Sequence, residues 1–201
     1  MSNIGKHSIT ATTPGNILLG AGTYMTGLTY GSNAWSGTPI GATSGGGKVS
    51  IVGELMDIEL DGAFVKVEGL TVKQGGKASM EVNFAELSVS LLKTATLFKE
   101  GTSNAQGYAM LEDKPHIVAG DYLSNFGFVG KTADGSKDII VIFEKALCTS
   151  GFEMEPKNKE NAVVKLTLEA VAPISGNLDV LPVKIYYPTA TTQTTQTTQQ
   201  Q

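Results

Sequence analysis

The stretch GATSGGGKVS, residues 41–50, places three consecutive glycines before Lys48, and a glycine-rich loop that ends in lysine is the chemistry of phosphate binding. Such a loop requires a glycine five residues before the Gly-Lys pair, a Ser or Thr after the lysine, and a helix whose N-terminal amides face the phosphates. Here Ala42 occupies the first position, Val49 follows the lysine, and the next residues have the pattern of a strand. The sequence therefore favours a flexible loop over a nucleotide site.

Carboxylates also cluster, because Asp57, Glu59 and Asp61 alternate with apolar residues. Paired carboxylates hydrolyse glycosides when they face each other across a cleft, whereas these three lie on one face of a predicted strand. A solvated strand face explains them better. The single Trp35 and the aromatic residues near it could form a sugar platform, and they could equally anchor a loop in a neighbouring subunit.

Metal and thiol chemistry has few candidate residues in this chain. His7 and His116 are too few and too far apart to indicate a metal centre, and the only cysteine, Cys148, excludes an internal disulfide. Cys148 lies in the apolar run IIVIFEKALC, where a small buried side chain is expected. We therefore predict no cofactor and no enzymatic activity.

The bulk composition is that of one folded domain rich in turns. The chain has 201 residues, 41% of them hydrophobic, only 17% charged, and 24 glycines. The formal charge of −4 gives no basic surface that would bind nucleic acid. No segment approaches the roughly 20 apolar residues that span a bilayer, so we expect no membrane insertion and a soluble protein made in the cytoplasm.

The chain divides into three predicted segments. Residues 1–47 are broken by turn-forming residues and are expected to form an extended arm and an inter-subunit loop. Residues 48–187 have the alternating pattern of a β-sandwich. Residues 188–201, rich in Thr and Gln, are expected to be a disordered tail.

Within the middle segment, the apolar phase shifts at Gly53 and predicts a bulge in a strand that starts at Lys48 and runs to a turn at Asp61-Gly62. A second turn is predicted at 74–77. One helix is predicted over about 84–98, with Asn83 and Glu86 as a capping box. Further strands are predicted at 65–72, 80–84, 122–129, 138–147, 151–155, 162–171 and 183–187. The predicted fold class is mainly β, a sandwich or barrel with one flanking α-helix.

The run KVSIVGELMDIELDGAFVKVEGLTVKQGGKASMEVNFAELSVSLLK, residues 48–93, resembles the major tail tube proteins of long-tailed phages with non-contractile tails. In that family a strand hairpin, a turn and a strand that leads into a short helix form the recognisable middle. Residues 144–173 resemble the family's late hairpin with a charged turn. The resemblance covers residues 10–187 in the order of elements.

The resemblance implies that subunits form hexameric rings, which stack into the tube of a virion tail assembled in the host cytoplasm. The implied partners are other copies of the chain, a tape-measure protein and tail-end proteins, with double-stranded DNA passing through without specific binding. The stretch GATSGGGKVS would then be a hinge between an inter-subunit loop and the first channel-forming strand. Candidate lumen residues are Asp57, Glu59, Asp61, Lys66 and Glu68, and candidate inter-subunit contacts are Tyr24, Tyr30, Trp35 and Lys48.

Two other functions stay open on the sequence. One is the inner tube of a contractile tail or injection machine, although a polar C-terminal tail would fit poorly inside a sheath. The other is a monomeric β-sandwich that binds a sugar or lipid through Trp35, Tyr24 and Tyr30. A monomer of that kind would leave the predicted N-terminal arm without a partner.

Overall fold

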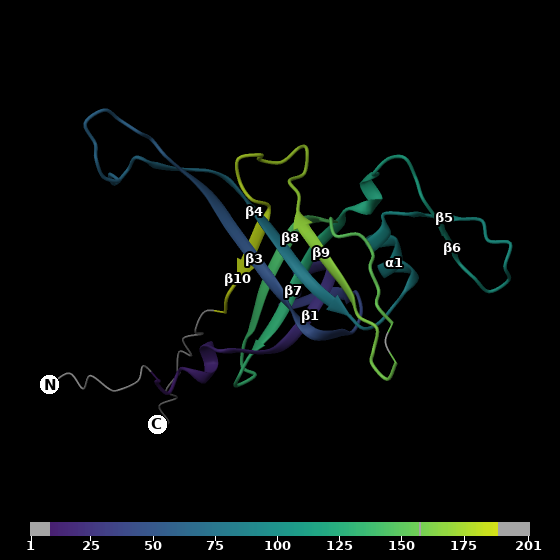
Figure 1. Cartoon of the computed structure of the whole chain (residues 1–201). Coiled ribbons are helices and arrows are strands. Elements are labelled where there is room, and N and C mark those ends of the chain that lie inside the picture. Colours follow the sequence, from purple (N-terminus) through teal and green to yellow (C-terminus); the bar gives the residue numbers. More distant parts are fainter. Residues whose placement is uncertain (1–8, 157, 189–201) are drawn as a thin grey trace, which may run out of the picture.

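The computed structural model describes residues 9–156 and 158–188, which form a mainly β fold with one α-helix, as the sequence predicts (Figure 1). The predicted tail at 188–201 lies, apart from its first residue, outside the described residues. The large antiparallel sheet contains β1 (Leu18–Gly31), β2 (Ala34–Pro39), β3 (Thr43–Asp57), β4 (Thr71–Phe84), β7 (Leu123–Thr132), β8 (Asp138–Cys148), β9 (Val164–Ala170) and β10 (Val183–Tyr186). The remaining elements are η1 (Pro14–Asn16), α1 (Val89–Thr96), β5 (Lys99–Gly101), β6 (Met110–Glu112) and η2 (Ala119–Asp121).

The sheet divides at β8 into two leaves that fold over one core. Its strand order is β2-β1-β7-β8-β9-β4-β3, and β10 also pairs with β8. One edge of β8 pairs with β10 over 140–143 and then with β9 over 146–148. Side chains from both leaves meet in a single buried cluster, which includes Tyr24 of β1, Met80 of β4 and Phe143 of β8. The result is a β-sandwich.

Alternation along β4 supplies part of this core, and the continuous apolar run of β8 supplies another part. Met80, Val82 and Phe84 are buried on one face of β4, which confirms the predicted third strand of the hairpin region. Cys148 at the end of β8 is also buried and reduced, as its apolar surroundings predict. Burial of such side chains is the main favourable term in folding, because each removes apolar surface from water.

The helix is shorter than predicted, because tertiary pairing overrides its apparent start. Phe84 pairs with Val164 of β9, so the chain stays extended there and α1 begins only at Val89. Ser88 is the cap, and its hydroxyl accepts a hydrogen bond of 3.1 Å from the amide of Leu91. The predicted capping box is wrong, since Asn83 belongs to β4 and the Glu86 carboxylate accepts a bond from the amide of Ala42.

Residues 1–47 are not only an arm and a loop, contrary to the prediction. Leu18–Pro39 form the β1–β2 hairpin, which turns at Ser32 and Asn33 with φ of 51° and 59°. Two residues at positive φ are typical of a tight hairpin turn, so the turn-forming residues at 31–33 join two strands. Glycines at positive φ shift the register of β1 and hide its alternation.

The stretch 41–50 also differs from its predicted role as a hinge. Thr43 onwards belongs to β3, which confirms that a strand and not a helix follows Lys48. Gly45 and Gly46, at φ of 78° and 75°, lie where the register between β3 and β4 shifts. The glycine run therefore builds a bulge in a strand that crosses Tyr24.

Gly47 lets β3 pass over the ring of Tyr24, and this close approach predicts a stability effect. A Cβ at this position would lie 2.2 Å from the Tyr24 hydroxyl and 2.6 Å from the carbonyl of Glu81. We expect Gly47→Ala to lower the free energy of unfolding by about 2 kcal/mol through overpacking, measured by urea denaturation. Gly31→Ala is the control, because a Cβ there meets no atom within 4 Å. Equal stability of the two variants would contradict the account.

The predictions for the second half of the chain are largely confirmed. The strands β7, β8, β9 and β10 match those predicted at 122–129, 138–147, 162–171 and 183–187. The exception is 151–155, which forms only an isolated bridge between Met154 and Val164. The late hairpin expected at 144–173 is therefore present as the antiparallel pair of β8 and β9, but a loop and not a second stretch of strand leads from β8 into β9 (Figure 1).

Candidate assembly surface

A long two-stranded ribbon projects from the sandwich (Figure 1). β3 and β4 pair from Thr43 and Phe84 near the body to Asp57 and Thr71 at the far end. β9 supports β4 only over 79–84, so among the described residues no further strand lies beside the distal part of the hairpin. An isolated two-stranded hairpin is marginally stable in water. The distal ribbon is therefore the part of the fold that most needs a partner.

A bulge marks the point where the ribbon leaves the body. The pairing of β3 and β4 shifts between Gly53 and Leu55, which confirms the bulge predicted at Gly53. Gly76 faces Gly53, and a Cβ there would lie 2.4 Å from the carbonyl of Val52. The turn predicted at 74–77 is wrong, because these residues lie inside β4, where Gly76 permits the close approach of β3.

The far end of the ribbon is a broad loop, residues 58–70, which we call the tip. Its neck is closed by a 2.7 Å hydrogen bond from the amide of Ile58 to the carbonyl of Leu70. The turn predicted at Asp61-Gly62 is confirmed, since Gly62 has a φ of 92° and the amide of Ala63 bonds to the carbonyl of Leu60. The strand predicted over 65–72 is wrong up to Leu70, because β4 begins only at Thr71.

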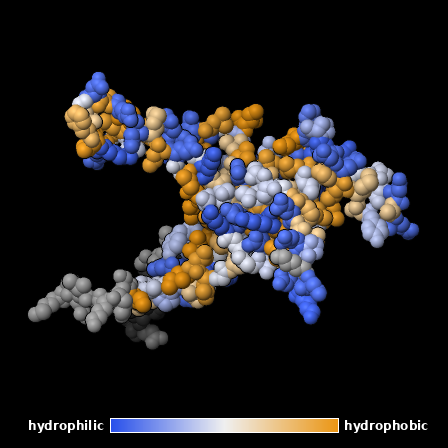
Figure 2. All heavy atoms as spheres, in the orientation of Figure 1, coloured by the Kyte–Doolittle hydropathy of each residue, from blue (hydrophilic) through white to orange (hydrophobic). Residues whose placement is uncertain are grey.

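The tip exposes large apolar side chains to solvent. The Phe64 side chain is 97% exposed and that of Val65 is 78% exposed. Figure 2 shows hydrophobic atoms gathered at this end of the molecule among hydrophilic ones. The other exposed apolar residues of the tip and the adjoining ribbon are Ile51, Val52, Leu55, Met56, Ile58, Leu60 and Val67. Exposed apolar side chains grouped in this way make the tip a candidate interaction surface.

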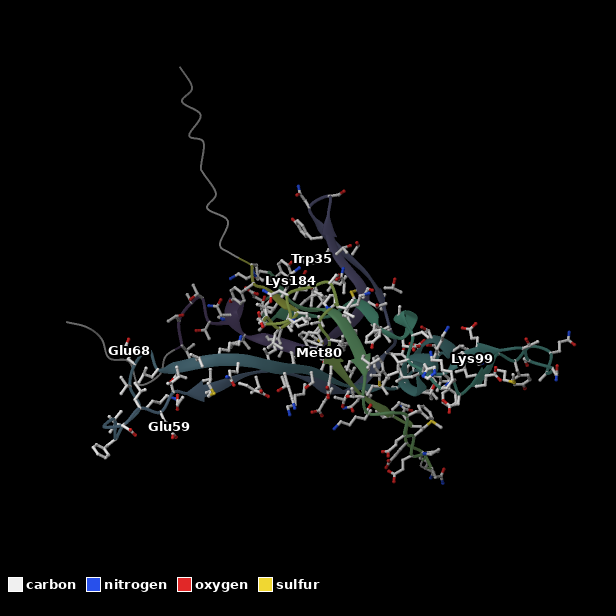
Figure 3. The ribbon with its side chains drawn as sticks, turned by 90° about the horizontal axis from the view of Figure 1, so that it is seen from above. Trp35, Glu59, Glu68, Met80, Lys99 and Lys184 are labelled. Carbon is white, nitrogen blue, oxygen red and sulfur yellow. The ribbon has the colours of Figure 1, made fainter. Side chains whose placement is uncertain are left out.

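The candidate lumen residues also gather at the tip (Figure 3). Asp57 ends β3, whereas Glu59, Asp61 and Glu68 lie in the loop, so the predicted row of acids along one strand face is wrong. The loop interrupts the alternation that placed them on one face. Lys66 balances part of the charge through a 2.9 Å ion pair with Asp57.

The carboxylate of Asp57 is held as an anion. Hydrogen bonds from Thr71 and Lys66 lower the pKa of Asp57, because both stabilise the charged form. These contacts join the end of β3 to the start of β4 and to the tip loop. Asp57 therefore has a structural role at the neck, distinct from the exposed acids beyond it.

Lys48, a predicted inter-subunit contact, lies on the polar outer face of the β3-β4-β9 leaf. Its ammonium is 3.5 Å from the carboxylate of Glu81, which is also 2.8 Å from the ammonium of Lys165. The hydrogen bond from Lys165, with the charges of both lysines, lowers the pKa of Glu81. This face thus presents partly neutralised charges in place of a basic patch.

The predicted aromatic contacts divide into a buried and an exposed group. Tyr24 is only 1% exposed and packs on Phe126 and Phe128 in the core, so its prediction as an inter-subunit contact is wrong. Burial raises the pKa of its hydroxyl. Tyr30 and Trp35 lie on the β1–β2 hairpin, where Tyr30 is exposed and Trp35 is half-buried.

Sequence reasoning missed a second projecting hairpin. β5 and β6 pair over three residues each, and an ion pair of 3.0 Å joins Lys99 to Glu112. Figure 1 shows this hairpin on the opposite side of the sandwich from the ribbon. Strands this short lack a periodic pattern that the sequence could reveal.

The described residues contain no group of three or more His, Cys, Asp and Glu side chains placed to hold a metal ion. Among residues 9–156 and 158–188, no helix is both long enough and apolar enough to cross a bilayer. The sequence matches no family model and no curated protein. The proposed function therefore starts from the geometry of the ribbon and its tip.

Proposed function

We propose that this protein is the subunit of a phage tail tube, a structural protein that assembles into stacked hexameric rings. The observation that carries the proposal is the β3–β4 ribbon, which extends beyond its supporting strand and ends in the apolar tip. A monomer would leave both the ribbon and the tip in water. The resemblance of residues 48–93 to tail tube proteins points to the same region of the chain.

Ring closure solves the problem of the open edge of the sheet. Within the described residues, β3 is a fifteen-residue strand with a strand neighbour on one side only. A long unpaired edge is a site of uncontrolled aggregation unless another chain covers it. Repeated head-to-tail contact between copies closes into a ring and removes that edge. In this proposal the tip then reaches the next subunit or ring, where its apolar side chains are buried.

Acidic residues at the tip suit a channel through which DNA slides. The segment 57–70 carries four carboxylates and one ammonium, a net charge of −3. Negative charge repels phosphates, whereas a basic lining would hold them by releasing counterions. We propose that the exposed acids Glu59, Asp61 and Glu68 lie near the lumen and keep the genome mobile.

The lumen proposal predicts a change in DNA retention. In a variant with Glu59→Lys, Asp61→Lys and Glu68→Lys, Asp57 and Lys66 keep the neck intact, and the net charge of 57–70 becomes +3. We expect assembled tubes of this variant to retain linear duplex DNA at low salt and to release it as salt rises. Wild-type tubes should not retain DNA. Co-sedimentation of labelled DNA with the tubes measures this.

The matched control places three lysines elsewhere on the surface. Glu153→Lys, Glu160→Lys and Asp179→Lys make the same change in charge at exposed positions outside the tip. Retention by the tip variant alone supports the lumen position. Equal retention by both variants, or by neither, contradicts it.

Sedimentation velocity of the full chain tests the proposed function. Incubation at rising protein concentration should convert a slow species into rings and then into much larger particles, because each ring offers a template for the next. A single slow species at every concentration, also after addition of tail-initiating proteins, would contradict self-assembly.

A further inference from the structure

A second, smaller apolar cluster lies on the face of the β1-β7-β8 leaf that points away from the core. Ile140 and Ile142 of β8 are buried there together with Leu28 of β1, whereas Val141 and Phe143 between and beside them enter the main core. Trp35 packs against this second cluster from β2. Its ring is therefore fixed on an outer face of the sandwich, away from the β3–β4 ribbon (Figure 3).

Three aromatic rings form a wall beside this cluster. The centroid of Trp35 is 5.1 Å from that of Tyr30 and 4.7 Å from that of Tyr186, which meets it edge-on at 65°. Edge-to-face contacts of this kind hold rings in place. Tyr30 and Tyr186 remain exposed, so the wall presents aromatic surface to solvent.

The wall borders a hollow of about 280 Å³ whose floor carries a row of polar groups. Asn125 of β7, Glu144 of β8 and Lys184 of β10 line it from neighbouring strands. The Lys184 ammonium is 2.6 Å from the Glu144 carboxylate, so the pair carries no net charge. Asn125 has a φ of 46°, a left-handed conformation that Asn adopts more readily than most residues with a Cβ.

We propose that this hollow binds a neutral saccharide, with one sugar ring against the aromatic wall formed by Tyr30, Trp35 and Tyr186. The C–H face of a pyranose packs on aromatic rings, and its hydroxyls both donate and accept hydrogen bonds. The Glu144 carboxylate accepts, the Lys184 ammonium donates, and the Asn125 amide does both. The balanced charge gives no preference for a phosphate or another ion, and the small volume suits a single ring.

Saccharide binding does not rest on the proposed tube function, because the hollow and the ribbon lie on different parts of the sandwich. Trp35 is the only tryptophan of the chain, so its fluorescence reports directly from the wall. The test is a fluorescence titration of the full chain with two trisaccharides, one of β-linked glucose and one of β-linked N-acetylglucosamine. We expect a saturable change with at least one of them, at a Kd of about 1 mM.

Variants of residues that line the hollow test which side chains contact the saccharide. Glu144→Gln removes the charge of an acceptor, and Tyr186→Ala removes one ring, so each should weaken binding about tenfold. Tyr108→Ala removes an exposed tyrosine outside the hollow and should bind as the wild type does. Circular dichroism checks that each variant is folded, and Glu144→Gln, which preserves the shape of the side chain, keeps the test valid if Tyr186→Ala is unstable.

Three results would overturn the proposal. A signal that fails to saturate with both trisaccharides excludes the site. Binding by Glu144→Gln and Tyr186→Ala as strong as that of Tyr108→Ala places it elsewhere. A shift of Trp35 emission with protein concentration alone, and none with sugar, shows that a second copy covers the hollow. Because sedimentation measures assembly separately, failure of sugar binding leaves the tube proposal untouched.

Discussion

Replacing Leu60, Phe64 and Val65 together with serine is expected to abolish tube formation while the subunit stays folded. All three side chains are largely exposed in the single chain, so their loss removes few contacts within the fold. Burial of each such side chain in a neighbouring subunit would contribute about 1.5–3 kcal/mol. Because every subunit of a ring repeats the contact, this free energy is lost at each interface of the ring. Sedimentation of the purified variant measures it.

The 171–182 loop offers a matched control for this experiment. Ile174, Leu178 and Val180 are as exposed as the tip residues, and Ile174 reaches 98%. The variant Ile174→Ser, Leu178→Ser and Val180→Ser therefore makes the same change in surface hydrophobicity at another place. It should assemble as the wild type does. Normal assembly of the tip variant would show that the tip is not the assembly surface.

Replacing Lys114 with methionine is expected to lower the free energy of unfolding by about 3 kcal/mol at neutral pH, because it leaves a buried carboxylate without its partner. The side chains of Lys114 and Asp121 are 11% and 3% exposed, and they form an ion pair. Asp121 also accepts a 2.7 Å hydrogen bond from the amide of Val118, which ties it to η2. Urea denaturation measures the loss.

The pH dependence of this loss has a definite sign. Burial raises the pKa of Asp121, but the hydrogen bonds from Lys114 and Val118 outweigh burial and keep that pKa below its ordinary value. In the wild type, Asp121 therefore contributes stability above the unfolded pKa of about 3.9, and this contribution is lost as pH falls through the lower folded pKa. In Lys114→Met, burial is no longer offset by the ammonium. The loss of unfolding free energy in Lys114→Met should therefore become smaller as acid protonates Asp121.

A double variant separates charge from packing. Lys114→Met with Asp121→Leu removes both charges and should recover much of the lost stability, since an apolar pair can replace a buried ion pair at little cost. A deficit in Lys114→Met that stays constant from neutral to acid pH would contradict the electrostatic explanation. A double variant less stable than the single one would do the same.

Alternation in the sequence was sufficient to predict the strands that form the core. Met80, Val82 and Phe84 show a clean period of two, and so do the residues of β9, whereas β8 is a continuous apolar run buried on both faces. β1 escapes prediction because glycines at positive φ shift its register, so that Tyr24 and Leu28, which are four positions apart and would share a face in a regular strand, enter different apolar clusters. Local periodicity cannot reveal a strand whose shape depends on bulges.

The two candidate sites differ in how far the sequence could reveal them. The tip residues are consecutive in the sequence, so their acidic and apolar composition can be seen there. The loop that removes Glu59 and Asp61 from the strand cannot, because it depends on how the ribbon closes. The hollow brings Asn125, Glu144 and Lys184 together from three strands that are distant in sequence. Of its aromatic wall, the sequence groups only Tyr30 and Trp35, because they are five residues apart, whereas Tyr186 comes from the other end of the chain.

Electron microscopy of the purified full chain, before and after prolonged incubation at high concentration, tests the central claim most directly. We expect tubes of uniform diameter with a central channel, built from stacked rings, and no tubes from the variant with three serines at the tip. Small monodisperse particles that persist under all conditions, also with tail-initiating proteins present, would contradict it.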